Sequence, residues 1–185
     1  MRKLEYLAAV ALFGAALAFG GSAFAALQTG AQAPDFTTQA SLAGKEFKFS
    51  LADALKKGPV VLYFYPGAFT KGCTIEANEF ADATEKFAAL GATVIGVSFD
   101  NIETLKKFYK TECRDKFAVA ADTDQSIMKA YDAVLTERPD RASRTSYVIT
   151  PNGKIIYALT ERDPIMHVTN TLAAVKEWDA KKAAK

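Results

Sequence analysis

One cysteine of the sequence stands where a buried strand meets a helix. The segment YFYPGAFTKGCTIEANEF, residues 63–80, places Cys73 after an aromatic run and a short loop of Pro, Gly and Thr. A thiol at the start of a helix faces unpaired backbone N–H groups and the positive end of the helix dipole, and both favour the thiolate. The thiolate is the form of cysteine that acts in nucleophilic and redox chemistry. The alternative is a small apolar cysteine that packs beneath the helix.

The residue three positions before this cysteine restricts the reactions that Cys73 can carry out. A thiol–disulfide exchange protein would carry a second cysteine there, in a C-x-x-C motif. Here the segment reads Thr70-Lys71-Gly72-Cys73, so no disulfide can close across the turn. The Thr70 hydroxyl can instead accept a hydrogen bond from one peroxide oxygen while backbone N–H groups donate to the other.

The pattern of apolar residues predicts the elements that position Cys73. Residues 59–66 and 92–99 are continuous apolar runs typical of strands buried on both faces. Between them, apolar residues recur every three or four positions from Cys73 to Leu90, which predicts an amphipathic helix ending at Gly91. The sequence also predicts an edge strand at 45–50, a helix opened by Asp100 or Asn101, a strand at 116–122, a helix at 124–134, a hairpin at 145–160 and a last amphipathic helix from 164.

This order of elements predicts one α/β domain. Strands and helices alternate, which indicates a mixed central sheet, parallel in its βαβ parts, with helices on both faces. Ligands of such sheets bind at the carboxyl ends of the strands, where Cys73 is placed. The 185 residues carry 23 Lys and Arg and 21 Asp and Glu, with the signs interspersed, so no nucleic-acid partner is indicated. One His and two distant Cys offer no metal site.

The first 25 residues differ in composition from the rest. Arg2 and Lys3 precede an apolar run at 7–19, and residues 22–25 carry an A-x-A cleavage pattern. The sequence therefore predicts a secretory signal over 1–25, a mature domain over 26–185, a bacterial periplasmic location and no membrane attachment after cleavage. An uncleaved anchor is the alternative, but the run is shorter than the about 20 residues that span a bilayer. In an oxidising compartment the two cysteines could also form a structural disulfide.

Several segments resemble a known family. YPGAFTKGCTIEANEF is similar to the P-x-x-x-T-x-x-C signature of the peroxiredoxins, and its C-T-x-E-A-x-x-F continuation resembles the PrxQ, or bacterioferritin-comigratory-protein, subfamily of AhpC/TSA proteins. The likeness extends from APDF through GATVIGVS and RTSYVITPNGKI to the last helix. It implies a thioredoxin-like fold and a thiol peroxidase that reduces hydrogen peroxide and organic hydroperoxides in antioxidant defence. It also implies no cofactor, recycling by a thioredoxin-like or glutaredoxin-like reductant, and a monomer or weak dimer.

The resemblance implies a role for each matching residue. Cys73 resembles the peroxidatic cysteine, which becomes a sulfenic acid. Thr70 resembles the hydroxyl that orients the peroxide, and Pro66 the proline that walls the pocket, although Pro66 also ends the strand. Arg144 resembles the arginine that holds the thiolate and the charge developing on oxygen. Glu76 belongs either to the hydrogen-bond network of the site or to simple pairing with the helix dipole.

Other polar residues carry no assigned catalytic role. Arg138 and Arg141 are interpreted as solvated loop charges, and His167 as a cap or surface residue. The PrxQ position for a resolving cysteine on the same helix is Asn78, so Cys113 is the remaining candidate. It either resolves the sulfenic acid after local unwinding, or follows the apolar face of its helix into the core and leaves resolution to an external thiol.

Two other functions compete with peroxide reduction. An exported disulfide reductase or isomerase lacks support, because no C-x-x-C motif is present. An exported non-catalytic thioredoxin-fold scaffold or chaperone would need none of the site residues. The presence of both Thr70 and Arg144 favours the peroxidase.

Overall fold

The computed structural model describes residues 26–184, and the predicted export signal over residues 1–25 lies outside them. The elements in chain order are β1 (Thr37–Leu42), β2 (Lys45–Ser50), α1 (Leu51–Leu55), β3 (Val60–Phe64), α2 (Lys71–Ala89), β4 (Thr93–Ser98), α3 (Ile102–Thr111), β5 (Ala118–Ala121), α4 (Ser126–Ala130), β6 (Val134–Leu135), β7 (Arg138–Ala142), β8 (Thr145–Ile149), β9 (Ile155–Thr160) and α5 (Pro164–Ala183).

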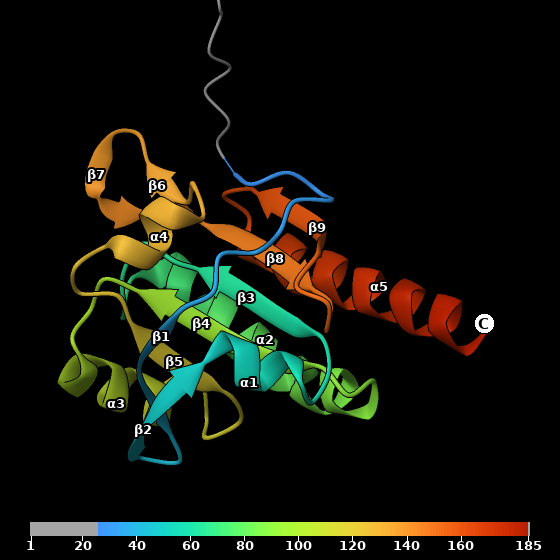
Figure 1. Cartoon of the computed structure of the whole chain (residues 1–185). Coiled ribbons are helices and arrows are strands. Elements are labelled where there is room, and N and C mark those ends of the chain that lie inside the picture. Colours follow the sequence, from blue (N-terminus) through green and yellow to red (C-terminus); the bar gives the residue numbers. More distant parts are fainter. Residues whose placement is uncertain (1–25, 185) are drawn as a thin grey trace, which may run out of the picture.

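A mixed seven-stranded sheet forms the centre of the domain, in the order β2-β1-β5-β4-β3-β8-β9 (Figure 1). Strands β3, β4 and β5 are parallel, and the helices α2 and α3 connect them. On either side of this unit, β8 and β1 pair antiparallel to it and continue into β9 and β2. The predicted α/β fold with a mixed sheet is therefore confirmed, and β3 lies in the interior of the sheet.

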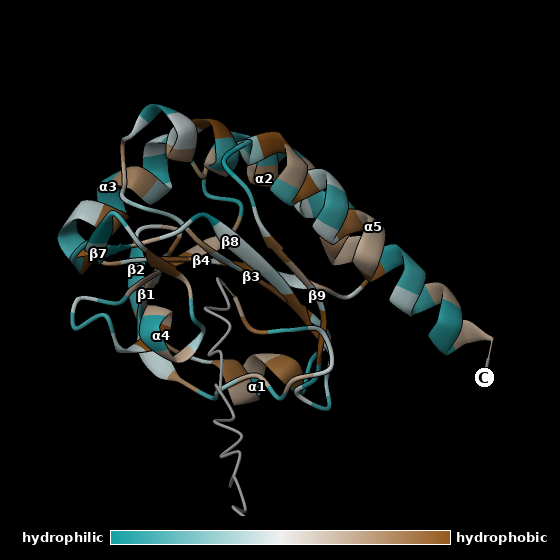
Figure 2. Cartoon of the chain, turned by 90° about the horizontal axis from the view of Figure 1, so that it is seen from above, coloured by the Kyte–Doolittle hydropathy of each residue, from teal (hydrophilic) through white to brown (hydrophobic). Residues whose placement is uncertain are grey.

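Helices cover both faces of the sheet, as the sequence predicted. Figure 2 shows α2, α3 and α5 on one side and α1 and α4 on the other. Alternate residues of β3 enter the two cores: Leu62 and Phe64 pack toward α1 and α4, whereas Val61 and Tyr63 pack toward α2, α3 and α5. Burial on both faces explains why this strand reads as a continuous apolar run.

Gly96 of β4 leaves room for the ring of Tyr63 to lie over the neighbouring strand. A Cβ at Gly96 would lie 2.6 Å from the Cζ atom of Tyr63, so the ring occupies the space that any other residue would fill. The ring of Tyr63 stacks on Phe80 of α2 with centroids 4.4 Å apart. The packing fixes α2, and with it the helix start that carries Cys73, against the central strands.

The structure decides between the two predicted caps of α3. Asn101 is the cap, because its side-chain oxygen accepts from the Thr104 backbone N–H at 2.9 Å. Other boundaries differ from the sequence prediction. Helix α3 ends at Thr111, so Cys113 lies beyond it rather than on it. The short helix α1 and the β6–β7 hairpin were not predicted, because five-residue elements carry too little periodicity to be distinguished from loops. None of the helices between residues 26 and 184 combines the length and the apolar composition that a membrane span requires.

Candidate active site

The loop between β3 and α2 is held by hydrogen bonds to the neighbouring strand end. The Ala68 backbone N–H donates to Asp100 Oδ2 at 2.7 Å, and the Ser98 hydroxyl donates to the same oxygen at 2.8 Å. Asp100 thus anchors the loop rather than capping a helix, a role that sequence reasoning missed. The Thr70 hydroxyl donates to the Gly67 carbonyl at 3.1 Å. Its oxygen lone pairs stay available to accept a hydrogen bond from a ligand.

Cys73 is the third residue of α2 and lies within its first turn. The first helical hydrogen bond runs from the Thr74 N–H to the Thr70 carbonyl, at 2.9 Å. The Cys73 residue is 1% exposed and its thiol is free. The predicted position at a helix start, beside the carboxyl end of β3, is therefore confirmed.

Arg144 joins this thiol to a buried carboxyl group. Its Nη2 donates to the Cys73 sulfur at 3.5 Å, and its Nη1 donates to Glu76 Oε2. The Arg144 side chain is 11% exposed and that of Glu76 is fully buried. Burial by itself lowers the pKa of Arg144, but its interactions with Glu76 and Cys73 outweigh burial, so the net pKa is raised and the guanidinium stays charged. A fixed positive charge therefore lies beside the sulfur.

Gly72 leaves the space that this arginine occupies. A Cβ built at Gly72 would lie 2.8 Å from Arg144 Nη2, closer than side-chain atoms normally approach. A larger residue here would push the guanidinium away from the sulfur unless the helix start shifted. The glycine next to Cys73 is thus explained by the approach of the arginine, a reason that the sequence alone does not reveal.

His167 was wrongly interpreted as a cap or surface residue. It is 0% exposed, and Asp163 caps α5 by accepting from the Ile165 N–H at 2.9 Å. The imidazole bonds to the Ser146 hydroxyl through Nδ1 at 2.8 Å and to the Glu161 carbonyl through Nε2 at 2.9 Å. Its Nδ1 lies 3.9 Å from Glu76 Oε1. His167 therefore belongs to the same buried polar group as Glu76 and Arg144.

Cys113 is a free, buried thiol in the same apolar core as Cys73. It is 0% exposed, and burial raises its pKa, so it is protonated at rest. Its neighbour Glu112 accepts a hydrogen bond from Asn78 of α2 at 3.1 Å. The end of α3 therefore lies beside the second turn of α2, next to the position where the resemblance would place a resolving cysteine.

Pro66 and Arg144 both line a cavity of about 680 Å³. The side chain of Arg141 is not simply solvated as predicted: its guanidinium lies 3.5 Å from the centroid of the Phe99 ring and it is 26% exposed. Arg138 has a 60% exposed side chain, in agreement with a solvated loop charge. Among these arginines only Arg144 has a hydrogen bond to the sulfur in the structure.

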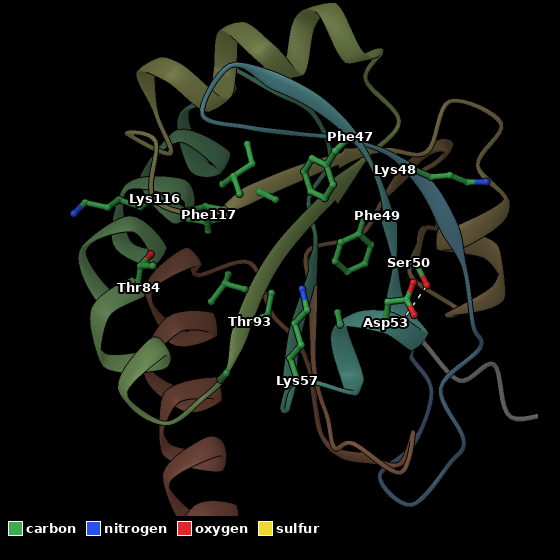
Figure 3. Close-up of a pocket in the computed structure, with 15 residues that line it drawn as sticks. Phe47, Lys48, Phe49, Ser50, Asp53, Lys57, Thr84, Thr93, Lys116 and Phe117 are labelled. Atoms are coloured by element: carbon green, nitrogen blue, oxygen red, sulfur yellow. Dashed lines mark hydrogen bonds between the residues drawn. The ribbon is translucent and has the colours of Figure 1, made fainter.

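A second cavity, of about 500 Å³, lies at the opposite end of the parallel strands, where β4 and β5 begin. Phe47, Phe49 and Phe117 are among the side chains around it (Figure 3). None of the candidate site residues, Pro66, Thr70, Cys73 and Arg144, lines this cavity, so it is separate from the candidate site.

Comparison with known proteins decides the family. The sequence profile described as the AhpC/TSA family matches residues 29–158. The chain belongs to this family. A protein of Bacillus subtilis (strain 168) named as a peroxiredoxin is 38% identical over 136 residues, which cover 69% of this chain and 75% of that protein. The chloroplastic peroxiredoxin Q of Sedum lineare is 32% identical over 152 residues, covering 82% and 79%.

Solved structures agree with this assignment. The crystal structure of peroxidoxin BcpB from Mycobacterium tuberculosis has a TM-score of 0.74 and 27% sequence identity, and the match covers 82% of this chain and 97% of that one. As an AhpC/TSA protein of the peroxiredoxin type, the chain is a thiol-dependent peroxidase with a thioredoxin-like fold. Peroxiredoxins act on peroxides and are reduced by thioredoxin-like partners, and the non-catalytic scaffold is not favoured.

Proposed function

We propose that Cys73 is the peroxidatic cysteine and that Arg144, Thr70 and Pro66 form its peroxide site. The observation that carries this proposal is the hydrogen bond from Arg144 Nη2 to the Cys73 sulfur, 3.5 Å long, at the first turn of α2. The guanidinium and the backbone N–H groups of that turn both stabilise negative charge on sulfur. They also stabilise the charge that develops on the peroxide oxygens.

The first step transfers one oxygen atom to sulfur. The Cys73 thiolate attacks the terminal oxygen of the hydroperoxide, so an S–O bond forms as the O–O bond breaks. The sulfur is oxidised by two electrons to a sulfenic acid, and the alkoxide or hydroxide leaves and takes a proton from water. Thr70 holds the peroxide, because its hydroxyl proton already bonds Gly67 and its oxygen can accept from the peroxide O–H. Pro66 limits the access of water from the adjoining cavity.

Cys113 is proposed to resolve the sulfenic acid. Its thiol would attack the Cys73 sulfur, forming an S–S bond and releasing water. Asn78, which contacts the end of α3, lies five residues after Cys73, or about 7.5 Å along an intact helix, so the first turn of α2 must unwind. Arg114 and Asp115, just after Cys113, both have positive φ values, 49° and 58°, a conformation that strains such residues and eases local rearrangement.

The electrons that complete the cycle come from a dithiol protein. A thioredoxin-like partner would reduce the disulfide by exchange, supplying two electrons and two protons. A glutaredoxin-like reductant is the other candidate donor. If resolution is external, the outside thiol first forms a mixed disulfide with Cys73.

Intact mass after one equivalent of hydrogen peroxide tests the two cysteine roles. We expect wild-type protein to lose about 2 Da, as an internal disulfide forms. The Cys113→Ser variant should instead gain about 16 Da. This oxidised species should disappear from the mass spectrum when a reagent that reacts with sulfenic acids is added. Wild-type protein that gains about 16 Da and forms no disulfide would show that an external thiol resolves Cys73.

The protein is proposed to act after export to a bacterial periplasm, as a domain of residues 26–185. The support is the basic start, the apolar run and the A-x-A pattern that precede residue 26. Expression of the full-length gene in a bacterium, followed by osmotic release and intact mass, should yield a protein that begins at Ala26. A released protein that retains Met1 would contradict cleavage after residue 25, and absence from the periplasmic fraction would contradict export.

A further inference from the structure

A buried polar group lies next to the proposed peroxide site and is not used by the mechanism above. It consists of Glu76 of α2, Ser146 of β8 and His167 of α5, and all three residues are 0% exposed. We name these three residues the buried polar cluster. It is joined to Cys73 through Arg144, which donates to both Glu76 and the sulfur.

The hydrogen bonds of the cluster define the state of the imidazole. The Glu161 carbonyl can only accept, so His167 Nε2 carries a proton and donates to it at 2.9 Å. In the neutral imidazole Nδ1 is then an acceptor, and the Ser146 hydroxyl donates to it at 2.8 Å. In the imidazolium, Nδ1 also carries a proton and becomes a donor.

Glu76 has one satisfied and one unsatisfied oxygen. Oε2 accepts from Arg144, whereas Oε1 is buried and has no hydrogen-bond partner among residues 26–184. His167 Nδ1 lies 3.9 Å from this oxygen. A buried carboxylate oxygen without a donor is costly. A proton on Oε1 removes the charge of the carboxyl group, and a proton on Nδ1 instead provides a donor 3.9 Å from Oε1, which a small shift would bring within hydrogen-bond distance.

Other ionisable groups also face the pair. Arg144 contacts Glu76 and its charge also acts on His167, Tyr63 of β3 interacts with Glu76, and Glu161 and Asp163 lie near His167. Burial raises the pKa of Glu76 to about 8, against the lowering effect of Arg144. Burial lowers the pKa of His167. Both shifts place the shared proton on the carboxyl group at neutral pH.

We propose that His167 is a positioning residue of the peroxide site. The Glu76 carboxyl group and Nδ1 of His167 together retain one proton at neutral pH, which leaves the positive charge of Arg144 uncancelled beside Cys73. Whichever group holds the proton, the pair has no net charge. When the pair loses this proton at higher pH, the carboxylate cancels the charge of Arg144 and its effect on the thiolate and on the peroxide declines. The inference rests on the proposed role of Cys73.

The pH dependence of peroxide reduction by the whole mature protein tests this. Competition with a haem peroxidase gives the second-order rate constant for hydrogen peroxide from about pH 6 to about pH 10. We expect the wild-type rate constant to fall above about pH 8, as the pair deprotonates. In His167→Asn one proton-binding group is lost, so the fall should begin about one pH unit lower. The second variant His167→Gln should shift it in the same direction if His167→Asn does not fold.

A matched control separates this role from packing of the helix. Thr171→Val removes a hydroxyl that donates to the His167 carbonyl at 2.6 Å, one turn further along α5. It should leave the pH profile where it is in wild type. A wild-type profile without the alkaline fall, or a His167 variant whose normalised profile superimposes on wild type, would overturn the proposal. If no sulfenic acid forms at Cys73 in the Cys113→Ser variant, the proposed function itself is wrong.

Discussion

Replacing Cys73 by serine is expected to abolish peroxide reduction, with a loss of at least about 10⁴-fold in the second-order rate constant. A serine hydroxyl keeps nearly the same volume, so the buried first turn of α2 should stay intact. It is not ionised near neutral pH, however, and cannot accept an oxygen atom as sulfur does. The rate constant for hydrogen peroxide, measured by competition with a haem peroxidase, checks the prediction.

The second cysteine provides the comparison for this variant. Cys113→Ser should still consume one equivalent of peroxide in a single turnover, because only the later resolving step is removed. Circular dichroism of both variants shows whether the fold is retained. A folded Cys73→Ser protein that still reduces peroxide at a rate near wild type would contradict the assignment of the peroxidatic cysteine.

Replacing Arg144 by methionine is expected to lower the rate constant for hydrogen peroxide by about 10²- to 10³-fold. The change removes the donor 3.5 Å from the Cys73 sulfur and the fixed positive charge beside it. Arg144→Lys should recover only part of the loss, because a single ammonium group cannot bond the sulfur and Glu76 in the same forked geometry. Steady-state and single-turnover kinetics with hydrogen peroxide measure both effects.

Two further variants show whether the position of this charge matters. Arg138→Met removes a 60% exposed positive charge from the same cavity and should retain the wild-type rate within about twofold. Gly72→Ala keeps Arg144 but places a Cβ 2.8 Å from its Nη2, so it should also slow the reaction, by about tenfold or more. Equal rates for Arg144→Met and Arg138→Met would mean that a general positive field, not the contact with sulfur, assists the reaction.

The sequence alone determined the elements around the site and the position of Cys73 between them. The continuous apolar run of β3, the loop and the amphipathic pattern of α2 are local features, and hydrophobic periodicity specifies them without long-range contacts. Their order also predicted the parallel unit and helices on both faces. The Asn152-Gly153 turn predicted the β8–β9 hairpin, and Gly153 has the positive φ, 78°, that such a turn favours.

Only the tertiary structure decided how distant residues combine at Cys73. Arg144 and the sulfur are 71 residues apart in the sequence, and the antiparallel pairing of β8 with β3 brings them together. The sequence indicates that His167 lies near a helix start, but only the packing of α5 against α2 buries it beside Glu76. Because periodicity shows which face of a helix is apolar but not which partner covers it, neither this burial nor the place of Cys113 beyond α3 was predictable.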